Sequence, residues 1–195
     1  MARKRKKRKQ NPIIGIFCEG ESEKQYFTML MQKYRRRNVK IKIVAADLSG
    51  KSLIDKTIGK IKQEAKDFDQ VYVVFDRDEH KKQELLECER LAKKNGIKIM
   101  FSSIDFEIWI LLHFEEVLRS YNRKELVKKL SQEGYFNCDY NDFKGKSYSE
   151  YIEDKVQDAV DNATKLYKKK NNWIEDDPFT NIQIYLPEIF DRNDF

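Results

Sequence analysis

The sequence predicts an α/β protein in which a four-stranded parallel sheet is flanked by helices. Two observations lead to this fold class: apolar strand-like segments alternate with amphipathic helical segments, and one of those strands is apolar throughout. The alternation implies parallel strands joined by right-handed crossovers, and a continuously apolar strand is typical of one that helices cover on both faces. At 195 residues, the chain has the size of one domain, or of one domain with a small appendage.

Strands and helices can be assigned in order along the first half of the chain. Helical segments show apolar residues on one stripe, as at Tyr26, Phe27 and Leu30, and Ser22 followed by Gln25 resembles a capping box at a helix start. The strands are predicted at residues 12–18, 39–45, 71–75 and 97–101. The helices are predicted at residues 22–36, 53–68 and 81–94.

From residue 105 onward the pattern becomes helical. Residues 106–114 are apolar nearly all round, which marks a buried helix. Further helices are predicted at 123–130 and 148–167, with a loop at 137–146 and a last helix that opens at 177–180 and is interrupted by Pro187. The chain therefore divides into a basic tail at 1–11, an α/β core at 12–104, and a helical C-terminal part at 105–195 packed on that core.

Seven consecutive cations stand near the amino terminus, and without them the net charge falls from +6 to −1. A block of like charges repels itself and is predicted to be disordered. It could bind nucleic acid through phosphate contacts, or it could serve only as a solubilising tail. The cations are Arg3, Lys4, Arg5, Lys6, Lys7, Arg8 and Lys9.

Composition excludes several classes of protein. No apolar run approaches the roughly 20 residues that span a bilayer, and no apolar signal segment stands at the amino terminus. Three widely spaced cysteines favour a reducing cytoplasm over a disulfide framework or a zinc site. Two histidines, His80 and His113, are too few for a histidine-based metal site.

Acidic residues follow two of the predicted strands. Glu19 and Glu23 come after the first strand, and Asp76 and Asp78 come after the third. Carboxyl ends of parallel strands face the crevice where open α/β sheets bind ligands, and Glu19 and Asp76 would emerge side by side if the strand order reverses there. Converging carboxylates repel one another unless a cation binds, so the sequence predicts a divalent metal and phosphate chemistry.

Each acid also has a simpler explanation. Asp76 and Asp78 would face one cation in an extended segment, but they could instead cap the next helix. Glu23 could be a favourable charge at a helix amino terminus. A D-x-D pair after an apolar strand also occurs in haloacid-dehalogenase-type phosphatases and in nucleotide-sugar glycosyltransferases. In those phosphatases the strand usually opens the domain, whereas here it is the third.

Glu107 lies near the start of the apolar helix at 106–114. A carboxylate buried there needs a partner or a metal, because an unpaired buried charge is costly. Alternatively, Glu107 points out through the one polar gap of the helix, beside Ser103. The neighbouring Trp109 and His113 are predicted to belong to the core.

Four ordered motifs resemble the RloB family, whose members are found near bacterial restriction loci and are associated with phage defence. The resemblance extends from residue 13 to about residue 190. One departure is that Ser102-Ser103-Ile104-Asp105 stands where the family often has Ser-Asn-Pro-Cys. The motifs are F-C-E-G-E-S-E-K-Q-Y-F at 17–27, V-F-D-R-D-E-H at 74–80, F-E-I-W-I-L-L-H-F at 106–114 and D-P-F-T at 177–180.

The resemblance implies a divergent TOPRIM-like or Rossmann-like α/β domain. In that comparison, Glu19 matches a metal-site residue and candidate general acid or base, and Asp76 and Asp78 match a metal-binding D-x-D. Glu23 matches a second acid of nuclease-like members, and Glu107 belongs to the third motif of the family. A companion ATPase of the defence system is a candidate partner.

The sequence, together with this resemblance, therefore predicts a cytoplasmic, Mg²⁺- or Mn²⁺-dependent nuclease-like protein of abortive-infection defence. Its substrate would be DNA or RNA, with tRNA among the candidates, and Arg77, His80 and the basic tail would contact the phosphate backbone. Two rivals stay open. One is a metal-dependent nucleotidyl or phosphoryl transferase, and the other is a nucleic-acid-binding or sensor subunit without catalysis.

Overall fold

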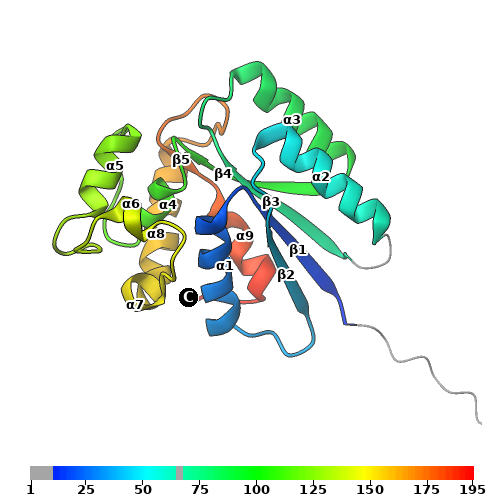
Figure 1. The fold of residues 1–195 in the computed structure, drawn as a ribbon, viewed down its shortest axis with the longest axis horizontal. Helices are drawn as coiled ribbons and strands as arrows, with labels where there is room; N and C mark the ends of the chain where they lie inside the picture. Colours follow the sequence, from blue (N-terminus) through cyan, green and yellow to red (C-terminus); the bar gives the residue numbers. More distant parts are fainter. Residues whose placement is uncertain (1–10, 65–67) are drawn as a thin grey trace, which may run out of the picture.

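A five-stranded sheet forms the centre of the computed structural model, which describes residues 11–64 and 68–195. Its strand order is β2-β1-β3-β4-β5 (Figure 1). The first four strands are parallel, as the sequence predicts, and the fifth is antiparallel to β4. The strands are β1 (Ile13–Cys18), β2 (Lys40–Ala45), β3 (Gln70–Asp76), β4 (Ile97–Ser103) and β5 (Phe179–Thr180).

The prediction of four strands is wrong by one, because β5 comes from the segment that was predicted to open a helix. It pairs Ser102 with Thr180 and Ser103 with Phe179. Two residues are too short a segment to show the alternation that marks a strand. As a result, the C-terminal part is not purely helical, and it returns to complete the sheet of the α/β core.

Helices cover both faces of the sheet. On one face, Ile14, Ile16 and Val74 share a core with α1 (Glu21–Lys33) and α9 (Ile182–Phe190). On the other face, Phe17, Val73 and Phe75 share a second core with α2 (Gly50–Gln63) and α3 (Lys82–Lys94). Successive strand residues thus point to opposite faces, and the three crossover helices are confirmed, although residues 65–67 of the predicted second helix lie outside the described part.

Two details of the predicted helices are wrong. Helix α1 begins at Glu21, so Ser22 lies inside it and the capping box is closed by Glu23 instead. Helix α9 continues through Pro187 to Phe190 and is not interrupted.

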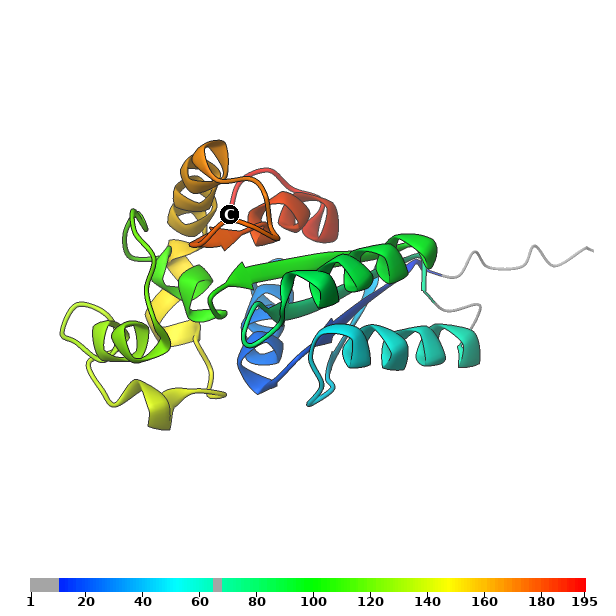
Figure 2. The ribbon, with the colours of Figure 1, turned by 90° about the horizontal axis from the view of Figure 1, so that it is seen from above.

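The remaining helices gather beyond the carboxyl ends of the parallel strands (Figures 1 and 2). The predicted loop at 137–146 contains a short helix, and the predicted helix at 148–167 is divided by a 3-10 turn at Glu153–Lys155. Within the described part of the chain, no helix is both long and apolar enough to cross a membrane. These helices are α4 (Glu107–Leu111), α5 (Arg123–Leu130), α6 (Tyr140–Phe143), α7 (Ser149–Ile152) and α8 (Val156–Lys169).

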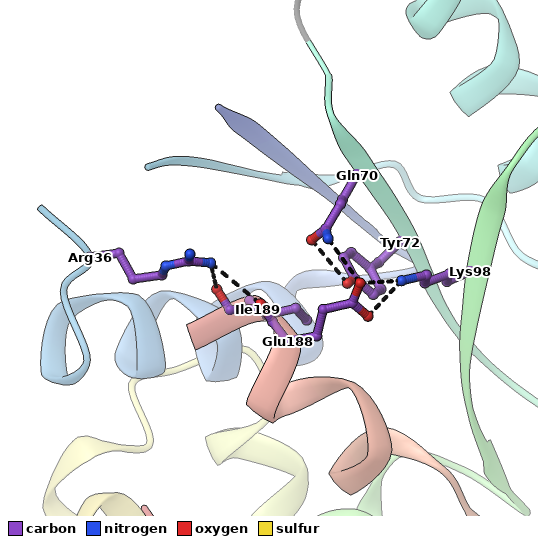
Figure 3. A network of polar contacts seen from close by, with 6 residues as sticks. All are labelled: Arg36, Gln70, Tyr72, Lys98, Glu188 and Ile189. Carbon is purple, nitrogen blue, oxygen red and sulfur yellow. Dashed lines mark hydrogen bonds and ion pairs between the residues drawn. The ribbon is translucent and has the colours of Figure 1, made fainter. Parts of the chain in front are cut away.

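Polar contacts fasten α9 across the sheet (Figure 3). The carboxylate of Glu188 accepts a hydrogen bond from Gln70 Nε2 at 2.8 Å and forms an ion pair with Lys98. Arg36, after α1, donates to the backbone carbonyl of Ile189 at 3.0 Å. The end of the chain is therefore tied to β3, to β4 and to the segment after α1.

Candidate active site

Glu19 and Asp76 lie side by side where β1 and β3 end. The two strands are neighbours, and the Glu19 backbone N–H donates to the Val74 carbonyl at 2.9 Å. The backbone N–H of Asp76 donates to Glu19 Oε2 at 3.3 Å. This position, between β1 and β3, is the point where the strand order reverses. The predicted meeting of these two acids is confirmed.

Ser49 and His80 hold the Glu19 carboxylate from the other side. Ser49 Oγ donates to Glu19 Oε2 at 2.7 Å and lies 2.8 Å from His80 Nε2. Because the single hydroxyl proton goes to Glu19, His80 Nε2 must carry a proton and donate to Ser49. Ser49 is the N-cap residue of α2 but makes no side-chain cap, so its hydroxyl serves Glu19 and not the helix. His80 was predicted to contact nucleic acid. In the structure its ring contacts Ser49, which in turn holds Glu19.

Gly50 makes room for the His80 ring, and its replacement tests the arrangement. Its φ is +51°, and a Cβ built there would lie 2.5 Å from His80 Cε1. We expect Gly50→Ala to lower the free energy of unfolding by more than the 1–2 kcal/mol of a left-handed conformation, because the ring must also move. Gly59→Ala in the same helix, where a Cβ meets nothing within 4 Å, should stabilise by about 0.5–1 kcal/mol. Urea denaturation measures both, and equal effects would contradict this role of Gly50.

Glu23 and Glu107 bring two more carboxylates to the same place. Glu23 is 5% exposed and Glu107 is 3% exposed. Glu23 Oε2 accepts from the Gly20 backbone N–H at 3.1 Å, so it closes the start of α1 as well as lying among the acids. Glu107 does not point out to solvent, and its Oε1 is paired with Lys144 Nζ at 2.8 Å.

Asp105 is an acid of this site that sequence reasoning missed. It is 4% exposed, and its Oδ1 has no hydrogen-bond partner. The only sequence signal is a second acid two residues before Glu107 in an otherwise apolar segment. Asp76 Oδ1 is also buried without a partner. We call the hollow lined by these acids the acidic pocket; it has a volume of about 290 Å³, and the exposed Glu21 stands among its lining residues. Its five buried or half-buried acids are Glu19, Glu23, Asp76, Asp105 and Glu107.

Burial and mutual repulsion favour the protonated forms of these carboxyls. Burial, and then the charges of Glu107 and Glu19, raise the pKa of Glu23 to about 7. Burial and Glu107 raise the pKa of Asp105 to about 8. The pKa of Asp76 is also raised well above its usual range, by burial and by Glu23 and the other acids. The same acids favour the charged form of Lys144. Burial lowers its pKa, but the neighbouring Glu107 more than offsets this, and the pKa of Lys144 is raised.

These shifts predict how stability depends on pH when no metal is present. A carboxyl whose pKa is raised in the native state holds its proton more tightly there than in the unfolded chain. Its contribution to stability is complete below the unfolded pKa of about 4 and is lost as the pH rises through the folded values of about 7 and 8. We expect the free energy of unfolding in EDTA to fall across this window by up to about 1.4 kcal/mol per pH unit for each extra proton bound. Urea denaturation at a series of pH values measures the slope. Asp105→Asn should flatten it and Glu79→Gln should not; equal slopes for both variants would contradict the assignment.

Asp78 does not line the acidic pocket. Its φ is +46°, and its backbone N–H donates to the Ile104 carbonyl, so the chain turns directly after β3. The carboxylate pairs with Arg123, whose Nε also lies 3.9 Å from Asp105 Oδ2. The prediction that Asp76 and Asp78 lie in one extended segment and face the same cation is therefore wrong, because Asp78 has a left-handed backbone conformation.

Arg77 is committed to structural contacts. Its guanidinium donates to Ser103 Oγ at 2.8 Å and to the carbonyls of Trp173 and Ile174 at 3.1 and 2.7 Å. These acceptors lie in β4 and in the segment before β5. Arg77, which was predicted to contact nucleic acid, is therefore not among the residues that line the acidic pocket. Residues 3–9 of the basic tail lie outside the described residues.

Trp109 and His113 belong to the core, as predicted. Both are buried, and His113 Nε2 lies 3.1 Å from the Tyr26 hydroxyl. Burial lowers the pKa of His113 to about 3, so the ring is neutral.

The donor set of the acidic pocket suits a hard cation in part. All five side chains offer carboxylate oxygens, which Mg²⁺ and Mn²⁺ prefer, and two buried oxygens lack partners. In residues 11–64 and 68–195, however, no three Asp, Glu, His or Cys side chains are already arranged as a metal-binding group. A cation would therefore have to draw the carboxylates closer together.

Comparison with known proteins adds the family. Searches among curated proteins and among solved structures found no match. The family model of the RloB-like protein matches residues 14–189, which include every member of the acidic pocket. Since this match covers most of the chain, the protein belongs to the RloB-like protein family.

Proposed function

We propose that this protein is a metal-dependent, nuclease-like enzyme that hydrolyses phosphodiester bonds of nucleic acid in anti-phage defence. The observation that carries the proposal is the buried, unpartnered Oδ1 of Asp76 beside Glu19 at the carboxyl end of the sheet. An uncompensated carboxylate of this kind is costly, and a divalent cation would remove the cost. The resemblance of the motifs to RloB and TOPRIM-like proteins supports both the chemistry and the defence role.

Glu19, Asp76 and Asp105 are the residues that we propose to hold Mg²⁺ or Mn²⁺. The ion supplies an activated water and neutralises charge on the phosphate. Glu19 is pre-positioned by Ser49 and by the Asp76 backbone N–H, which limits its rotation. Asp78, matched to the metal pair by sequence, instead orients Arg123 in this proposal.

The other side chains of the pocket have roles in proton transfer and in substrate charge. Glu23, with its pKa raised to about 7, suits a group that takes up or releases a proton near neutral pH. Lys144 and Arg123 line the same pocket, where they would stabilise the negative charge of a phosphate. DNA, RNA and tRNA are the candidate substrates, the site of action would be the cytoplasm, and a companion ATPase of the defence system would be a partner.

A cleavage assay with matched variants tests the proposal. Full-length protein is incubated with labelled DNA, RNA and a tRNA pool in Mg²⁺ or Mn²⁺. We expect cleavage that Glu19→Gln reduces by about 10²-fold or more, the usual scale for one stabilising group of an active site. Glu79→Gln, an exposed acid nearby, should leave the rate unchanged. If no substrate is cut with either metal, the proposal fails.

A non-catalytic sensor is the second candidate, and one observation favours it. Among the described residues, no group of side chains is already arranged to bind a metal. In a sensor, the acids would have no catalytic role. The sensor predicts salt-dependent nucleic-acid binding that survives Asp76→Asn. A nucleotidyl or phosphoryl transferase would instead turn over nucleotides without cutting strands, which the same assay detects.

A further inference from the structure

A groove with four cationic side chains opens next to the acidic pocket. It has a volume of about 700 Å³ and lies between α5 and the segment that contains α6. One acid, Asp139, is among its lining residues. We call it the basic groove and define it by its cations, which are Arg123, Lys124, Lys128 and Lys144.

The basic groove and the acidic pocket adjoin each other. Arg123 and Lys144 line both hollows. Their charges are partly balanced by the acids, because Arg123 pairs with Asp78 and Lys144 with Glu107. A ligand in the groove would therefore contact two side chains that also border the acids.

Lys124 and Lys128 supply charge that the protein does not neutralise. Both side chains are exposed, and neither has an ion pair or side-chain hydrogen bond within the described residues. As positions i and i+4 of α5 they share one helix face, and the helix rise separates them by about 6 Å along its axis. The groove thus presents two unpaired cations on α5, beside two cations that are paired with acids at the pocket.

We propose that the basic groove binds the phosphate backbone of a single-stranded nucleic acid and leads it into the acidic pocket. This inference rests on the proposed function and deepens it by naming the class of substrate. A cation row tracks a backbone of regularly spaced phosphates, whereas a compact anion needs only one or two of the charges. Glu23, Asp105 and Glu107 are buried, and a single strand bends a phosphate toward them more readily than a duplex, which is stiff over about 150 base pairs.

Cys138 provides a reporter inside the groove. It lines the basic groove and is exposed, whereas Cys18 and Cys88 are buried. In the native full-length protein, alkylation by a maleimide therefore reports on Cys138. At an oligonucleotide concentration about ten times Kd, mass action leaves roughly a tenth of the sites free, so a bound strand should slow alkylation about tenfold.

The experiment measures this protection in EDTA with a 12-nucleotide single strand, as DNA and as RNA. Wild-type protein should be protected, and Lys124→Gln/Lys128→Gln should lose protection at the same concentration. The salt dependence of binding should fall in slope by about 1.4, or 0.7 for each lost contact to a single strand. Lys93→Gln/Lys94→Gln on α3 removes the same charge from another face and should behave as wild type.

Several results would overturn the inference. They are equal protection in both double variants, equal protection by a duplex of the same sequence, and equal protection by inorganic pyrophosphate at matched phosphate concentration. The outcome is independent of catalysis because the assay contains no divalent metal. Protection in EDTA combined with no cleavage in the metal-containing assay of the proposed function would refute the hydrolysis and keep the groove. Cleavage in that assay at an unchanged kcat/KM in Lys124→Gln/Lys128→Gln would refute the groove and keep the hydrolysis.

Discussion

We expect Mn²⁺ to stabilise the wild-type protein, and we expect the replacement of Asp76 by asparagine to abolish that stabilisation. In the absence of metal, Asp76 is a buried acid surrounded by Glu23, Asp105 and other carboxyls that raise its pKa. A cation that binds the native state at 100 times its Kd stabilises that state by about 2.7 kcal/mol. For a chain of this size, that amounts to roughly 5–10 °C in Tm.

The Asp76→Asn variant should differ from the wild type both without metal and with Mn²⁺. Without metal at pH 8 it should be more stable than wild type, because a buried carboxyl with a raised pKa costs stability above its unfolded pKa and the amide does not titrate. With Mn²⁺ its Tm should not move. Calorimetry with and without EDTA measures both effects, and Asp55→Asn, an exposed acid paired with Lys51 on α2, is the matched control. A shift of equal size in Asp76→Asn and wild type would exclude Asp76 from the metal site.

Arg77→Ala should cost about 3 kcal/mol or more of unfolding free energy. The arginine joins the end of β3 to Ser103 and to the carbonyls of Trp173 and Ile174. Hydrogen bonds from a charged donor contribute about 1.5–3 kcal/mol each, and their loss leaves acceptors without partners. Arg77→Lys keeps the charge but not the branched donor geometry, so we expect an intermediate loss.

Urea denaturation measures this loss, with Arg90→Ala as the control. Arg90 is exposed on α3, and its replacement should change stability by less than about 0.5 kcal/mol. The same variants also test the sequence-based role of Arg77. If Arg77→Ala were as stable as Arg90→Ala but bound nucleic acid less tightly, Arg77 would be a backbone contact after all, and the structural role would be wrong.

Much of the fold could be predicted from local patterns. The apolar segments that end at Cys18 and Phe75 identify two buried parallel strands, because continuous apolar runs and strand–helix alternation are properties of the sequence itself. The two-residue strand at Phe179–Thr180 could not be predicted this way. It pairs with residues about 77 positions earlier, and no local periodicity records such a contact.

The candidate site was predictable only where its residues directly follow strands. Glu19 and Asp76 could be identified because parallel strands bring their carboxyl ends to one edge. The roles of Asp78 and Arg77 could not, because a turn at Asp78 and partners in distant segments redirect both side chains. Ser49 was missed for a related reason: at the start of a helix it resembles an ordinary cap, and only the folded chain aims its hydroxyl at Glu19.

By itself, then, the sequence determined the parallel sheet, the position of Glu19 and Asp76 at the carboxyl ends of its strands, and the family. These depend on strand period, on crossover handedness and on short ordered motifs, all of which are written locally in the chain. Only the tertiary structure decided that Asp105 joins the acids, that Asp78 pairs with Arg123, and that a basic groove adjoins the acidic pocket. Those features join side chains from segments far apart in the sequence, and their electrostatics exist only once burial has removed the surrounding water.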